Sequence, residues 1–125
     1  MKLSTYAVIL SVVCTFFGLG LLVIPNAFLA SYGITLDDHG VLMTRGYGLA
    51  LFQLAIIFFM SRNTPPTDKL WRTLLISALI FNLVNIPLGI IAIKDGVVNS
   101  MGWSTIVVYA VFVLGSLYFL NSTKK

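Results

Sequence analysis

The sequence predicts an all-α integral membrane protein, with residues 1–125 forming one domain, a four-helix bundle. The first observation is composition, because 58% of the residues are hydrophobic and only 10% are charged, with a mean hydropathy of +0.99. Soluble domains are typically about a quarter charged. The second is that four apolar runs each approach the ~20 residues that a helix needs to cross a bilayer. Their hydrophobicity is continuous, without the alternation of a membrane β-barrel.

The first predicted span covers residues 3–24. Its apolar core is longer than the roughly 7–15 residues of a secretory signal, and the following NAFLAS places Phe28 where a cleavage site needs a small residue. We therefore expect a retained anchor. Cys14, the only cysteine, lies in this run, which excludes an intrachain disulfide and predicts a small buried apolar side chain.

The connector after the first span is long and partly apolar. Residues 27–32 predict a short interfacial helix, with Tyr32 at headgroup level. Thr35 and Asp38 match the [ST]-x-x-[DE] capping box that begins a helix. The alternative for the adjacent Asp37, Asp38 and His39 is a metal site, but these residues supply too few well-spaced ligands. We expect no metal and no cofactor.

Three further spans are predicted at residues 41–60, 71–93 and 103–120. Trp71 and Trp103 stand at the starts of the last two, where aromatic belts meet the headgroups. Pro87 interrupts the third span and predicts a kink, because proline removes a helical hydrogen bond.

The distribution of Lys and Arg predicts the orientation. With four spans, the two termini and the middle connector share one side of the membrane. That side carries Lys2, Arg62, Lys69, Arg72, Lys124 and Lys125, against Arg45 and Lys94 on the other. By the positive-inside rule, both termini are expected in the cytoplasm, with the protein in the inner membrane.

Polar side chains inside the spans are costly and therefore become candidate site residues. On the third span, Asn82 and Asn85 share a helix face with Ala78 and Gly89. This face predicts either helix–helix adhesion or a small polar ligand pocket beside the proline.

On the second span, Gly46, Ala50 and Gln53 form a small-residue face carrying an amide. Gln53 and Asn82 lie roughly 13 and 16 Å from the cytoplasmic ends of their helices, at a rise of about 1.5 Å per residue. This similar depth predicts an amide pair between them.

Arg45 lies about one turn inside the outer boundary, and two interpretations remain open. In one, its long side chain snorkels to the interface and pairs with Asp37, Asp38 or Asp95. In the other, Arg45 faces the bundle with Asn85 and Tyr109 and binds an anionic headgroup or polar ligand, since its guanidinium donates paired hydrogen bonds.

Few residues are suited to catalysis. The sequence contains no Glu and one His, and its four Asp residues lie in connectors. A nucleophile–base arrangement would need Cys14 or a serine with the distant His39, and no acidic residue lies in a span for proton-coupled export. The eight Lys and Arg residues form no basic stripe, which excludes nucleic acid as a partner.

Three segments resemble the DoxX-like group of small bacterial four-helix membrane proteins: PNAF at 25–28, TRGYGLALFQ at 44–53 and NSMGW at 99–103. The resemblance implies the four-span topology and marks Arg45 as a motif position. Some relatives are implied to be membrane subunits of quinone-linked oxidoreductases, but the cysteines or histidines of a redox role are missing here.

We therefore expect a non-catalytic accessory subunit or a binder of lipid or another small hydrophobic ligand. The expected partners are membrane lipids and a larger membrane complex or a homo-oligomer. The alternative is a membrane-embedded enzyme or transporter that uses a cavity around Arg45, Gln53, Asn82, Asn85 and Tyr109.

Overall fold

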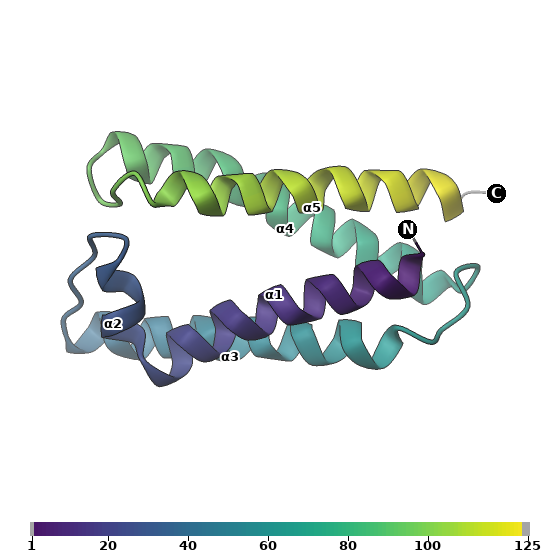
Figure 1. The fold of residues 1–125 in the computed structure, drawn as a ribbon, viewed down its shortest axis with the longest axis horizontal. Helices are drawn as coiled ribbons and strands as arrows, with labels where there is room; N and C mark the ends of the chain where they lie inside the picture. The colour runs from purple at the N-terminus through teal and green to yellow at the C-terminus, as the bar shows by residue number, and fades with distance from the viewer. Residues whose placement is uncertain (1, 124–125) are drawn as a thin grey trace. The chain divides into compact units, whose positions relative to one another are not determined.

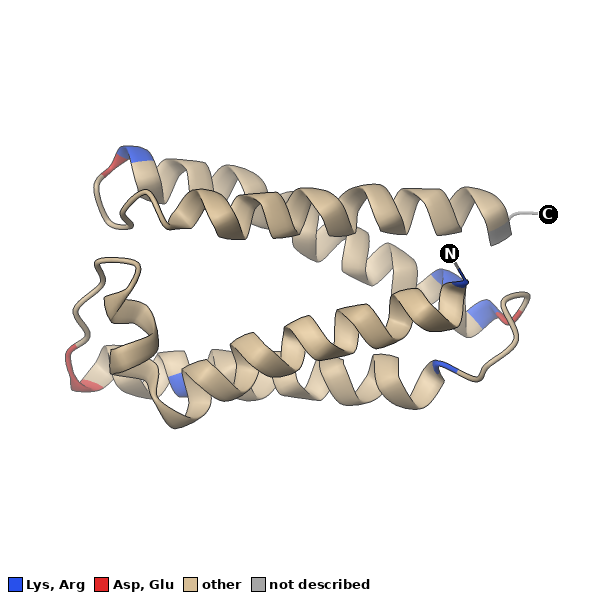
Figure 2. Cartoon of the chain, viewed as in Figure 1, with Lys and Arg blue, Asp and Glu red and all other residues tan. Residues whose placement is uncertain are grey.

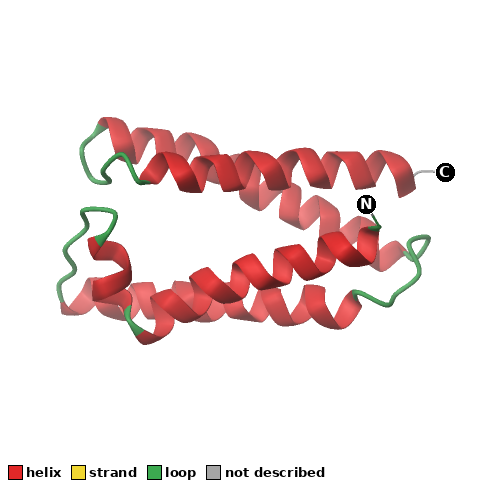
Figure 3. Cartoon of the chain, viewed as in Figure 1, coloured by secondary structure: helices red, strands yellow, loops and turns green. Residues whose placement is uncertain are grey.

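The computed structural model describes residues 2–123, which contain five helices and no strand (Figures 1 and 3). The helices are α1 (Leu3–Val23), α2 (Pro25–Ala30), α3 (Asp38–Ser61), α4 (Lys69–Lys94) and α5 (Gly102–Thr123). All except α2 are long and apolar enough to cross a membrane. The predicted all-α helical-bundle class and the four spans are confirmed, and together they indicate a multi-pass membrane protein.

The chain divides into two compact units. The N-terminal unit, Met1–Arg62, contains α1, α2 and α3, and the C-terminal unit, Asn63–Lys125, contains α4 and α5. Within each unit the two long helices pack against each other as a hairpin. The predicted spans therefore form pairs of neighbours in sequence, as short connections favour.

The short helix α2 follows α1 almost directly. Pro25 occupies its first turn, where the missing N–H of proline costs no hydrogen bond. The predicted interfacial helix is thus present but begins and ends two residues earlier than expected. It ends before Tyr32 because Gly33 adopts a positive φ of 75° and the Ile34 N–H donates back to the Leu29 carbonyl.

Helix α3 begins at Asp38, three residues before the predicted span. Its N-cap is Asp37, whose Oδ1 accepts a hydrogen bond from the Gly40 N–H at 2.7 Å. The predicted capping box of Thr35 and Asp38 was wrong. An N-cap side chain accepts a hydrogen bond from the backbone N–H two or three residues later in the chain. Gly40 is three residues after Asp37 and therefore meets this spacing. Asp38 instead supplies a negative charge in the first turn, where it interacts favourably with the positive end of the helix dipole.

The closest approach of α1 and α3 is at two glycines. A Cβ built on Gly18 would stand 2.8 Å from the Gly48 carbonyl oxygen, and one built on Gly48 would stand 2.6 Å from the Gly18 carbonyl oxygen. Two backbones therefore touch where neither residue has a side chain, which is how small residues let membrane helices approach. This contact does not use the small-residue face predicted on this helix, because Gly46 has open space at its Cβ position. Adhesion through that predicted face stays a prediction.

In the C-terminal unit, α4 runs from Lys69 through Pro87 to Lys94. Asp68 caps its start by accepting the Leu70 N–H at 2.9 Å, and Gly96, with φ of 75°, turns the chain after its end. Helix α5 returns antiparallel, with Ile106 beside Gly89.

Trp71, predicted at the membrane interface, also has a role within the protein. It is completely buried, and its Nε1–H donates to the Thr64 carbonyl at 2.9 Å, which fixes the preceding loop to the first turn of α4. Trp103, at the start of α5, remains 49% exposed, as an aromatic belt residue would be.

Candidate functional site

The five predicted site residues are divided between the two units. Arg45 and Gln53 lie on α3, Asn82 and Asn85 lie on α4, and Tyr109 lies on α5. Each unit therefore holds part of the set. The joint cavity and the amide pair between Gln53 and Asn82 stay predictions.

Arg45 is exposed and stands seven residues after the first residue of α3, about 10 Å along the axis. Within the N-terminal unit, no hydrogen bond or ion pair joins it to Asp37 or Asp38, and Asp37 is occupied in capping the helix. Among residues 2–123, the other charged residues lie in loops or in the first or last turn of a helix (Figure 2). Arg45 thus lies about two turns after the start of α3. Its position one turn inside the outer membrane boundary stays a prediction.

Asn82 and Asn85 both bond to their own helix. The Asn82 Nδ2–H donates to the Ala78 carbonyl and the Asn85 Nδ2–H to the Phe81 carbonyl, each at 2.7 Å. Asn82 is 5% exposed, so this bond supplies a partner that a buried amide needs. Such back-bonding uses one of the two N–H donors of each amide without a ligand.

Asn85 and Tyr109 come to a similar depth in the C-terminal unit. Gly89 of α4 faces Ile106 of α5. Asn85 precedes Gly89 by four residues on α4, and Tyr109 follows Ile106 by three residues on α5. The two helices are antiparallel, so both residues lie about 4.5–6 Å from the contact in the same direction. The predicted agreement in depth between these two residues is therefore supported.

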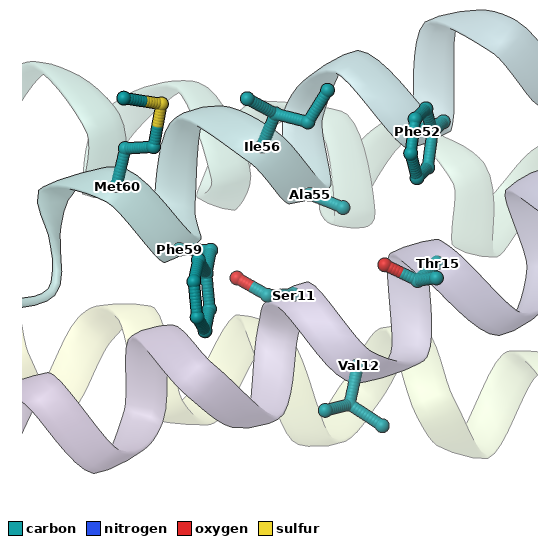
Figure 4. Close-up of a pocket in the computed structure, with 8 residues that line it drawn as sticks. All are labelled: Ser11, Val12, Thr15, Phe52, Ala55, Ile56, Phe59 and Met60. Atoms are coloured by element: carbon teal, nitrogen blue, oxygen red, sulfur yellow. The ribbon is translucent and has the colours of Figure 1, made fainter.

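An apolar groove of about 390 Å³ lies between α1 and α3 (Figure 4). This is within the range of about 300–1,000 Å³ that small-molecule sites occupy. Figure 4 shows the side chains of Ser11, Ala55 and Phe59 in the space between the two helices. The groove is lined by Ser11, Val12 and Thr15 of α1 and by Phe52, Ala55, Ile56, Phe59 and Met60 of α3.

The chemistry of the groove is hydrocarbon-like. Six of the eight lining side chains contain only carbon or sulfur heavy atoms. The other two, Ser11 and Thr15, each carry one hydroxyl group. The Ser11 hydroxyl donates to the Ala7 carbonyl of its own helix at 2.8 Å, so it is already satisfied. The groove therefore has no charged group on its walls and suits an apolar chain.

Sequence reasoning missed this groove. A usable signal was present in α1, where Ala7, Ser11 and Gly18 follow helical spacing and are all buried. The facing residues of α3 include Gly48 and Ala55, which are buried too. Small residues on both helices permit close approach at one level, and Phe52 and Phe59 frame the space left beyond it.

Among residues 2–123, no three His, Cys, Asp or Glu side chains lie close enough together to hold a metal ion. Cys14 is partly buried in the middle of α1 and forms no disulfide. The groove between α1 and α3 is therefore the feature of the N-terminal unit that we consider as a ligand site.

Comparison with known protein families, curated proteins and solved structures finds no match to this chain.

Proposed function

We propose that this protein is a non-catalytic helper of the inner membrane that holds one lipid acyl chain in the groove between α1 and α3. The groove itself carries the proposal. Its walls are apolar, it belongs to a hairpin of two helices long enough to span a bilayer, and the surrounding solvent of such helices is hydrocarbon.

The physical argument concerns what fills the groove. An unfilled groove loses dispersion contacts along its walls. Water would find few hydrogen-bond partners there, because only Ser11 and Thr15 of the lining residues carry hydroxyl groups and the Ser11 hydroxyl already donates to its own helix. An acyl chain restores the contacts without desolvating any charge, so it is the occupant that this chemistry favours.

Two residues of the same type and exposure allow a matched test. Val12 lines the groove and is 61% exposed, whereas Val23 lies outside it on the same helix and is 65% exposed. We expect Val12→Trp, at the edge of the groove, to obstruct it and remove a lipid that stays bound to the purified protein in native mass spectrometry. Val23→Trp should leave the bound lipid in place, since its side chain is remote from the groove.

The proposal would be contradicted if the wild-type protein retained no lipid beyond that of Val12→Trp, or if the two tryptophan variants lost lipid equally. The same spectra report whether the protein forms a homo-oligomer or binds a partner subunit. Assembly of either kind is part of the proposed helper function. We also propose that the protein is related to the DoxX-like group and that both of its termini lie in the cytoplasm.

The alternative function is a membrane-embedded enzyme or transporter centred on Arg45, Asn82 and Asn85. It receives less support, because both asparagine amides donate to carbonyls of their own helix. The groove favours the binding function.

A further inference from the structure

The groove has two unlike ends. Its lining residues on α1 all precede Gly18, and those on α3 all follow Gly48. The backbones of α1 and α3 touch at these glycines, so an acyl chain cannot pass between them there. The other end of the groove points toward the end of α3, where Arg62 follows Ser61.

Arg62 is held at this second end by two contacts with a residue of the groove wall. Its Nη1–H donates to the Phe59 carbonyl at 2.7 Å, and its guanidinium carbon lies 3.9 Å from the centroid of the Phe59 ring. Phe59 also lines the groove. The positive charge is therefore fixed beside the groove, on the side away from the glycine contact.

The Arg62 guanidinium retains donors for a ligand. It carries five N–H groups, and the bond to Phe59 uses one of them. Lys2, which precedes α1, lies at the same end of this antiparallel hairpin and is exposed, while the acidic Asp37 and Asp38 lie at the other end of α3. This end of the N-terminal unit thus combines an apolar groove with two positive charges.

We infer that the groove takes an anionic phospholipid from the leaflet on the Arg62 side, with an acyl chain between α1 and α3 and the phosphate against Arg62. The inference rests on the proposed function and adds the headgroup and the leaflet. Arginine suits a phosphate because its fork donates two parallel hydrogen bonds. A zwitterionic lipid would fill the groove equally well but would gain less from two positive charges.

The test uses nanodiscs containing equal amounts of phosphatidylglycerol and phosphatidylcholine with identical acyl chains, followed by native mass spectrometry of the lipid retained by the protein. We expect the wild type to prefer phosphatidylglycerol, with Arg62 contributing about fivefold, as one basic residue near a membrane surface provides. Arg62→Gln should lower the ratio by about that factor. Arg62→Lys should keep most of the preference, which separates charge from any loss of helix capping, and higher salt should weaken it.

Arg45→Gln is the matched control, because Arg45 lies on the same helix beyond the glycine contact. It should leave the preference unchanged. The inference fails if Arg45→Gln, and not Arg62→Gln, removes the preference, or if both lipids are retained equally by the wild type. In the second case, retention that still disappears in Val12→Trp would leave the proposed function standing, whereas retention unaffected by Val12→Trp would overturn that function as well.

Discussion

Gly18 and Gly48 form the tightest contact between α1 and α3, and each is closest to backbone atoms that no rotamer change can move. We expect Gly18→Ala and Gly48→Ala each to lower the free energy of unfolding by about 1–3 kcal/mol, the usual range for overpacking. Denaturation of the protein in mixed micelles, followed by circular dichroism, measures the change. Gly46→Ala on the same helix is the control, because its Cβ would meet open space.

Alanine is the better helix former by about 1 kcal/mol, so Gly46→Ala should be neutral or stabilising. Equal losses in all three variants would show that the glycine contact does not hold the hairpin together. The sequence could not distinguish Gly46 from Gly48. Two residues apart on a helix, they point to opposite sides, and each begins a plausible row of small residues. Only the position of α1 decides which side is packed.

At the scale of the helix, the start of α3 depends on one carboxylate. Asp37 Oδ1 accepts the Gly40 N–H at 2.7 Å, so Asp37→Ala should lower the free energy of unfolding by about 1 kcal/mol. Thr35→Ala should have little effect, because Thr35 lies two residues outside the N-cap. The same micellar denaturation compares them, and a larger loss for Thr35→Ala would restore the capping box that the sequence suggested.

The sequence predicted the helices well because hydrophobic length and proline or glycine punctuation act locally. All four spans agree with α1, α3, α4 and α5 to within a few residues, and α2 lies close to its predicted place. Trp71 shows what local reasoning does not reach. Its position at a helix start indicated the membrane interface, but burial and the bond to Thr64 depend on how the loop folds back.

For the whole molecule, the candidate site was harder to predict than the fold. The energetic cost of polar groups inside a membrane directed attention to polar residues, and two of these, Asn82 and Asn85, each donate one hydrogen bond to their own helix. The groove contains no charged or amide side chain that would mark it in the sequence. It arises because α1 and α3 touch at Gly18 and Gly48 while larger side chains beyond that contact leave space, which is a property of the pair rather than of either sequence segment.

The orientation of the protein can be tested at two exposed loop positions. Thr67 lies between α3 and α4, and Ser100 lies between α4 and α5, so the two positions flank one span. With Cys14 replaced by alanine, the proposed orientation makes Thr67→Cys reactive toward an impermeant maleimide only after the cells are opened. Ser100→Cys should react in intact cells once the outer layers are permeable to the reagent.

The expected result follows from charge. Arg62, Lys69 and Arg72 surround the Thr67 loop, and basic residues near helix ends are retained on the cytoplasmic side. The reverse labelling pattern would place the termini outside and would move the Arg62 end of the groove to the outer leaflet. Labelling of the two cysteines from the same side would contradict α4 as a membrane span. The maleimide experiment therefore tests the topology of the chain and the leaflet that supplies its lipid together.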